Sequence, residues 1–401
     1  MLIELIIFLA LGILAGTFTG IAPGIHINLV GSILLSLSAS VFLGINPIIF
    51  VVFIVAMSVV HTFIDFIPSI YLGAPQDGTE LSVLPGHELL KEGKAHEAVL
   101  ITLLGSLISI FLIILLSPLL IFSIPKLNLL IKPVIPFLLI IISIFLVTRE
   151  KDRIFSALLV FVLAGILGLI TLNIELKEPL LPLLTGLFGA SSLIISIKQK
   201  TKIPEQKIPS IKEIDITKKE LISIGIFSTF FSSILGFLPA IGSGQIAVIS
   251  STAKKINNKQ FLFSLGIINP FMIILSFLTI YIIKKGRTGS AVFLGEILGN
   301  ISISQIILIL IVSLISGILA FVIGINLSKF LARNINKINY SKISIFVLFF
   351  LLIIVTIFSG FLGTIIFIVA TATGVYCIQS NVRRTQMMGC LLIPTIILYL
   401  V

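Results

Sequence analysis

Charged residues are scarce in this chain of 401 residues: they make up 11% of it, whereas 58% of the residues are hydrophobic. Soluble domains carry about a quarter charged residues, so this composition excludes an ordinary soluble protein. Long stretches have no acidic residue, lysine or arginine, among them 5–64, 98–125, 154–174, 221–253, 297–328 and 343–382. A membrane-spanning helix needs about 20 apolar residues. The sequence therefore predicts an all-α, polytopic membrane protein with about 10–12 transmembrane helices.

Cysteine and enzyme signatures are also missing. The two cysteines, Cys377 and Cys390, lie in apolar surroundings and cannot build a disulfide framework or a metal site. The patterns HExxH, GxSxG and GxxxxGK[ST] do not occur. We therefore expect no enzyme, no cofactor, no metal and no ATP hydrolysis, so that transport would draw on an ion gradient or a substrate gradient.

The positive charge lies in loops. The net charge is +11, and segment 198–220 holds seven lysines against four acids. Basic residues concentrate in cytoplasmic loops of membrane proteins, so this charge indicates topology and no nucleic-acid partner. We predict a basic cytoplasmic linker at 198–219 between two membrane repeats, 1–197 and 220–401. The expected location is the cell membrane of a prokaryote, crossed several times.

The two halves share two sequence patterns. GIAPGIHINLVGS from Gly20 is similar to GFLPAIGSGQIAV from Gly236, and segment 66–90 is similar to segment 277–298. Two matching pairs in the same order indicate an internal duplication. If each half has an odd number of spans, the repeats are inverted. Secondary transporters often have this plan, with the substrate site at broken helices near the membrane midplane.

Four helix breaks indicate where such a site would lie. Backbone groups that a break frees cannot face lipid, and the N-terminus of a half-helix attracts anions. The alternative is that these prolines and glycines are only tolerated kinks. The predicted substrate-binding residues are Pro23, Gly24, His26, Asn28, Gly73, Gly78, Thr79, Pro239, Gly242, Ser243, Gly244, Gln245, Arg287, Gly289 and Ser290.

Ionisable residues inside the apolar runs are candidates for proton or ion coupling. His61 and Asp65 are four residues apart on one predicted helical face, and Asp77 lies in a glycine-rich turn that corresponds to the turn holding Arg287. Ionisable groups at membrane depth are costly and by default functional. The alternative for His61 and Asp65 is a polar pair that fixes helix packing. Lys284 and Lys285 are expected to be ordinary juxtamembrane charge.

Two further predictions concern packing and surface. Gly12, Gly16 and Gly20 repeat every four residues, which predicts a close helix contact. Segment 87–98 mixes acids, lysines and histidines and is expected to be a solvated amphipathic stretch, with His87 and His96 on the surface.

The run IYLGAPQDGTELSVLPGHELLKEGKAHEA, 70–98, resembles the signature of the large membrane subunit of tripartite tricarboxylate transporters. Similar motifs occur at 22–27, 238–255 and 286–295. The chain departs from them at His26 and Asn28, at Ala240, and at Arg287-Thr288. The resemblance implies a gradient-driven permease in the lipid bilayer for a small organic anion such as a carboxylate. It also implies a small membrane subunit and an extracytoplasmic solute-binding protein as partners.

Two other functions fit the same residues. Paired broken helices with Arg287 would also suit a translocase for a lipid-linked (polyprenyl) phosphate. A membrane-embedded lipid-modifying enzyme could use His61 and Asp65 as an acid/base pair.

Overall fold

The computed structural model describes residues 1–22, 46–74, 78–150, 152–176, 178–198, 203–214, 216–238, 241–252, 256–337 and 340–400. These residues form helices and no strands. Eight helical segments among them are long and apolar enough to cross a membrane. They are α1 (Leu2–Ile21), α3 (Pro47–Ile64) with α4 (Phe66–Leu72), α6 (Ala95–Ile131), α8 (Ile154–Asn173), α9 (Leu180–Leu184) through α10 (Ser191–Lys198), α13 (Asn258–Ile283), α15 (Ile303–Asn334) and α16 (Tyr340–Gln379). The predicted all-α, multi-pass architecture is confirmed.

Shorter helices fill the space between the spans. They are α5 (Val83–Lys91), α7 (Ile135–Thr148), α11 (Lys218–Leu235), α12 (Ser243–Thr252), α14 (Gly289–Leu298) and α17 (Gly389–Leu400). One π-helical turn, η3 (Thr185–Ala190), joins α9 to α10, and a 3₁₀ turn, η6 (Arg384–Met388), precedes α17. The total of 10–12 spans stays a prediction, because residues 23–45 lie outside the described part of the chain.

Helix α16 is sharply bent. Gly360 has a φ of 67°, which is not a helical value. The hydroxyls of Thr356 and Thr364 are 2.9 Å apart, although eight residues of a straight α-helix rise about 12 Å. Each arm has nearly the length of a membrane span. This break was not among the predicted ones.

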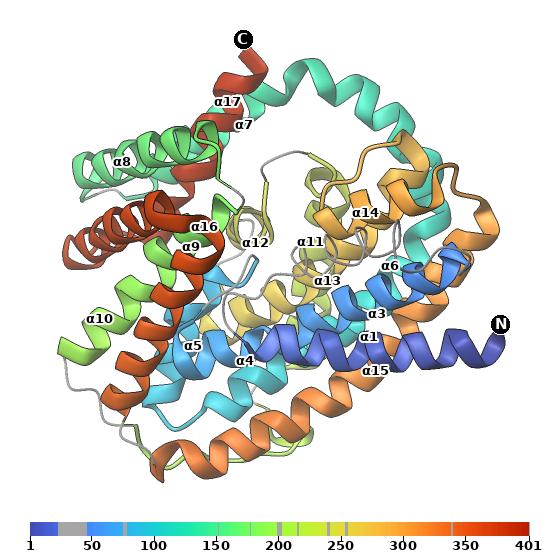
Figure 1. Ribbon diagram of the computed structural model, residues 1–401. Coiled ribbons are helices and arrows are strands. Elements are labelled where there is room, and N and C mark those ends of the chain that lie inside the picture. Colours follow the sequence, from blue (N-terminus) through green and yellow to red (C-terminus); the bar gives the residue numbers. More distant parts are fainter. Residues whose placement is uncertain are drawn as a thin grey trace.

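The helices form two bundles (Figure 1). The large bundle contains α1, α3 to α6 and α11 to α15, in which α13 packs along α6 and α15 packs along α3 and α6. The small bundle contains α7 to α10 with α16 and α17, in which α17 packs on α8 and α16 packs on η3 and α10. Each half of the sequence thus contributes its first helices to the large bundle and its last helices to the small one. The boundaries of the two repeats, their duplication and their inversion stay predictions.

The glycine repeat in α1 has the predicted packing role. A Cβ atom on Gly12 would lie 2.6 Å from the Phe53 carbonyl oxygen, and one on Gly16 would lie 2.5 Å from that of Met57. The missing side chains let α1 approach the backbone of α3 directly. This prediction is confirmed.

The prediction for segment 87–98 is wrong. His87 and His96 are only 8% and 1% exposed, and His96 Nδ1 lies 2.8 Å from Ser328 Oγ of α15. Glu88, Lys91 and Glu92 do face outward, so the segment is amphipathic, but its histidines lie on the buried face. The linker covers it: Gln206 accepts a hydrogen bond from the Ala95 amide at 3.0 Å and donates one to the Leu90 carbonyl.

Candidate functional site

A cavity of about 540 Å³ lies where the two bundles meet. The large bundle lines most of it, and the small bundle contributes Ile135, Leu180, Leu391 and Tyr399. The polar and charged side chains at its wall are His61, Thr62, Asn128, Ser243, Asn269, Thr279, Lys285, Arg287, Thr288, Ser290 and Tyr399. Apolar side chains fill the remainder, which is the usual composition of a small-molecule site.

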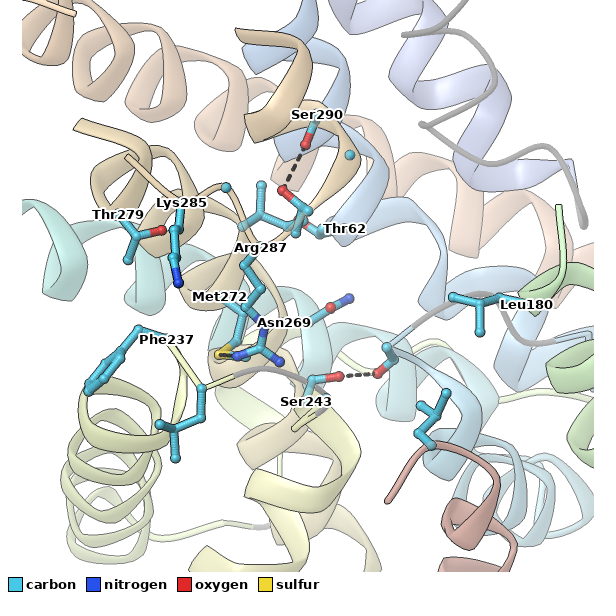
Figure 2. A pocket seen from close by; sticks show the side chains of 18 of the residues that line it. Thr62, Leu180, Phe237, Ser243, Asn269, Met272, Thr279, Lys285, Arg287 and Ser290 are labelled. Carbon is cyan, nitrogen blue, oxygen red and sulfur yellow. Dashed lines mark hydrogen bonds between the residues drawn. The ribbon is translucent and has the colours of Figure 1, made fainter. Parts of the chain in front are cut away.

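The turn between α13 and α14 places Arg287 at this wall. Ser276 Oγ accepts hydrogen bonds from the amides of Arg287 and Thr288, at 2.9 and 3.0 Å. The Thr288 hydroxyl then caps α14 by accepting from the Ala291 amide. Arg287 Nη1 donates to the Gly236 carbonyl oxygen and lies 3.9 Å from Met272 Sδ (Figure 2). The backbone and the guanidinium are both held, so the cation has a defined position.

Breaks from the two sequence halves also meet at the cavity wall. Ser243, the first residue of α12, donates its hydroxyl proton to the Gly78 carbonyl oxygen at 2.7 Å (Figure 2). Gly78 has a φ of 95°, and a Cβ atom there would lie 2.5 Å from Asn269 Oδ1. We call Gly78, Ser243 and Asn269 the cavity floor. Its close packing depends on the missing side chain at Gly78.

A buried carboxylate lies directly behind the floor. Asp65 is fully buried, and its Oδ2 accepts a hydrogen bond from Asn269 Nδ2 at 3.2 Å. Asn269 precedes Pro270 in the middle of α13. Proline has no amide proton, and the Gly266 carbonyl one turn earlier accepts from Ser106 Oγ instead.

His61 lies one helical turn before Asp65 and also lines the cavity. Its Nδ1 is 3.0 Å from Thr19 Oγ1 of α1. Both ionisable residues therefore lie beside the cavity. His61 contacts α1 through Thr19, and Asp65 contacts α13 through Asn269. An ionisable group at this place can respond to what the cavity holds.

The structure brings together seven of the predicted site residues. His61, Gly78, Gly242, Ser243, Arg287, Gly289 and Ser290 all line the cavity. Four others lie beside it without lining it: Asp65, Thr79, Gly244 and Gln245. Pro23, Gly24, His26, Asn28, Asp77 and Pro239 lie outside the described residues, so their roles stay predictions, as does the pairing of Asp77 with Arg287.

Gly73 lies elsewhere. It ends α4 with a φ of 64°, and a Cβ atom there would lie 2.6 Å from the His87 ring. Its position in the structure is that of a packing residue at the α4–α5 contact.

Several cavity residues were not predicted as site residues, and three of them show what kind of signal the sequence carries. Asn269 lies in an apolar helix directly before a proline, a signal that the sequence does carry. Thr62 is adjacent to His61 and looks like an ordinary helix residue. Lys285 was assigned to juxtamembrane charge, whereas the structure places it at the cavity with Arg287.

The sequence matches the tripartite tricarboxylate transporter TctA family over residues 6–389. The chain belongs to this family. It is also 31% identical to "Uncharacterized protein MJ1079" of Methanocaldococcus jannaschii, over 98% of this chain and 99% of that protein. No solved structure matches the chain.

Family membership decides between the classes of function. The TctA family is a transporter family, so the chain is a multi-pass membrane transporter of the tripartite tricarboxylate type, which works with other subunits. The alternative of a lipid-modifying enzyme that uses His61 and Asp65 is wrong on this ground.

Proposed function

We propose that the chain is the permease of a secondary transporter that moves a small organic anion, such as a carboxylate, with the energy of an ion gradient. The observation that carries this proposal is the fixed guanidinium of Arg287 at the cavity wall, with Lys285 beside it in sequence and at the same cavity. Two cations at one cavity inside a membrane protein favour an anionic ligand.

The carboxylate would bind at the α13–α14 turn. Arg287 offers planar N–H donors, and the hydroxyls of Thr288 and Ser290 lie at the same wall, 3.1 Å from each other. Helix α14 begins at Gly289, so the positive end of its dipole faces the same region. Apolar side chains such as Phe237 and Leu391 would contact the carbon skeleton.

Asp65 is proposed to carry the coupling ion. It lies behind the floor and is linked to the cavity through the Asn269 amide, whose other side faces the ligand space. A proton or a sodium ion would neutralise this buried carboxylate, and an anion in the cavity would favour that neutralisation. His61 would tune the same equilibrium.

The partners follow from the family. A small membrane subunit and an extracytoplasmic solute-binding protein are proposed to complete the transporter, in the cell membrane of a prokaryote. The family match supports a multi-subunit system, and the identity of each partner is part of the proposal.

Uptake by the full chain in proteoliposomes tests the proposal. Radiolabelled citrate and a panel of mono- and dicarboxylates are offered with proton and sodium gradients in turn. We expect accumulation that an ionophore for one ion abolishes, a large loss in Arg287→Gln, and partial recovery in Arg287→Lys. Arg333→Gln is the matched control, because Arg333 is exposed at the end of α15. Transport by Arg287→Gln at the wild-type rate would contradict the proposed site.

A second variant tests the coupling role. Asp65→Asn preserves the size of the side chain but not its charge. It is expected to retain exchange of labelled for unlabelled anion while losing accumulation against a gradient. Accumulation equal to that of the wild type would rule out Asp65 as the coupling residue. Movement of a polyprenyl phosphate across the bilayer, without carboxylate uptake, would support the translocase instead.

A further inference from the structure

Arg384 is a second arginine that hydrogen bonds hold in place; it is partly buried and does not line the cavity. It begins η6, and its Nη1 donates to Ser192 Oγ at 2.6 Å and to the Phe188 carbonyl oxygen at 3.3 Å. Phe188 belongs to the π-helical turn η3, and both partners are buried. π-helical turns are frequent at functional sites because they expose backbone carbonyls that a regular helix would use itself.

No acidic side chain balances this charge within the described part of the chain. The neighbouring Arg383 pairs with Glu150 at 3.4 Å, whereas Arg384 forms no ion pair there. The hydrogen bonds recorded for Arg384 use Nη1 alone, which leaves the Nε and Nη2 edge of the guanidinium. That edge is the fork that binds a carboxylate or phosphate through two parallel hydrogen bonds.

The surroundings of Arg384 are positive and polar. Both Arg384 and Lys91 lower the pKa of His87, and burial lowers it more, to about 3. His87 therefore stays neutral at physiological pH and adds no positive charge beside Arg384. A guanidinium among neutral groups in a membrane domain is costly unless an anion joins it for part of the time.

A short chain of contacts connects Arg384 to the cavity floor. Gly78 of the floor is followed by Thr79, whose carbonyl oxygen accepts hydrogen bonds from Ser69 and Ser82. Ser82 lies in the 3₁₀ turn Glu80–Ser82, which packs on η3 beside Arg384. In the segment that supplies Ser243 to the floor, the next residue, Gly244, is close to Met388 of η6. Arg384 thus lies behind the floor and does not line the cavity.

We propose that Arg384 is a second anion-binding station in the translocation path. It receives the carboxylate of the transported anion when the protein opens on the side opposite the cavity, as Arg287 holds it on the cavity side. This inference rests on the proposed function. Beyond that function, it assigns a binding role to a residue behind the floor. It also gives the path of the anion, from Arg287 past Gly78 and Ser243 to Arg384.

Transport kinetics measured separately from each side of the membrane test the station. The full chain is reconstituted in one orientation, and radiolabelled citrate is the probe. We expect Arg384→Gln to raise KM roughly tenfold or more for citrate offered from the side opposite the cavity, with little change from the cavity side. Arg384→Lys should recover part of this loss, and Arg383→Gln, the adjacent exposed arginine, should behave as the wild type. Arg287→Gln should raise KM mainly for citrate offered from the cavity side.

Two results would overturn the station. One is an unchanged KM from both sides in Arg384→Gln. The other is an equal loss of rate from both sides with lower thermal stability in Arg384→Gln and Arg384→Lys, which a purely structural arginine would produce.

A binding measurement separates this inference from the proposed function. If the wild type transports none of the organic anions, the proposed function fails, and Arg384 is then tested by phenylglyoxal modification of the intact protein. Peptide mass spectrometry reads the modification with and without citrate or inorganic phosphate. Protection of Arg384 by either anion supports an anion site there. If neither anion slows the modification of Arg384, the result would contradict an anion site there.

Discussion

The two glycine-rich turns, 73–79 and 286–290, share a sequence pattern but lie in different surroundings. In the first turn Gly73, Ala74, Gly78 and Thr79 are all buried. In the second turn Gly286 to Gly289 are partly exposed, and Lys284 and Lys285 before it are exposed. The first turn forms part of the floor and of the α4–α5 contact, whereas the second borders the cavity.

Among the described residues of the two turns, those of the second turn border the cavity and, apart from Ser290, are partly exposed, whereas those of the first turn are buried. Arg287 on the second turn lines the cavity, whereas His87 and Arg384, which lie beyond the first turn, do not. If the two halves are inverted repeats, an alternative conformation would bury the second turn and expose the first. Alternating access in duplicated transporters has this form. The inversion itself stays a prediction.

The largest expected effect is on thiol reactivity. Thr79→Cys and Thr288→Cys place one thiol in each turn, in a chain that also carries Cys377→Ala and Cys390→Ala. In detergent, a water-soluble maleimide should label Thr288→Cys faster by more than an order of magnitude, because Thr79 is fully buried and Thr288 is not. Equal rates would show that the turns do not differ in access. A faster reaction of Thr79→Cys on addition of citrate would show that they exchange surroundings.

Stability should also distinguish the turns. In Gly78→Ala the new Cβ meets Asn269 Oδ1 at 2.5 Å and the backbone must keep a φ of 95°, so we expect a loss of about 3 kcal/mol. Gly286→Ala meets Val292 but needs no positive φ, and about 1 kcal/mol is expected. Thermal unfolding in detergent measures both. Gly225→Ala, whose Cβ has 3.9 Å of clearance, is the control and should be near neutral or slightly stabilising.

A smaller effect is expected at the hydrogen bond that closes the floor. Ser243→Ala removes the bond to the Gly78 carbonyl and should cost about 1 kcal/mol. It should also increase maleimide labelling of Thr79→Cys, because the floor would open more often. Ser233→Ala, which removes only a hydrogen bond to Thr229 within α11, is the matched control. Unchanged labelling in Ser243→Ala would mean that this bond does not hold the first turn closed.

The smallest effect concerns pH. Helix α5 lies outside the candidate spans, and burial together with Arg384 and Lys91 lowers the pKa of His87 from 6.5 to about 3. The unfolded chain therefore binds a proton before the folded one does. Stability is complete above the ordinary pKa and falls as the pH drops below it, by about 0.7 kcal/mol between about pH 7 and about pH 6. His87→Asn should lack this part of the slope in thermal unfolding. A slope equal to that of the wild type would contradict the buried neutral state.

Several parts of the site could be predicted because local chemistry reveals them. Arg287 between two glycines, the breaks around Gly78 and Gly242, and His61 inside an apolar run all stand out against their neighbours. Asn269 carried a similar signal in the Asn-Pro pair of α13. Gly73 does not line the cavity, and its sequence signal is ambiguous because a glycine with a positive φ is needed equally at a binding turn and at a helix end. Lys285 and Arg384 have no local signal, because lysines and arginines are common beside membrane helices.

By itself, the sequence determined that this chain is an all-α membrane protein, because uncharged runs of span length have no other stable place than lipid. It also predicted that α1 makes a close helix contact, since small residues at every fourth position leave one helix face bare, and the structure identified α3 as the partner. Only the tertiary structure decided that each half divides between two bundles and that two breaks meet at one floor. It also decided that Arg287 faces a cavity while Arg384 does not. Residues as distant as Gly78 and Ser243 become neighbours through long-range packing, and no local pattern encodes which side of such a contact is open.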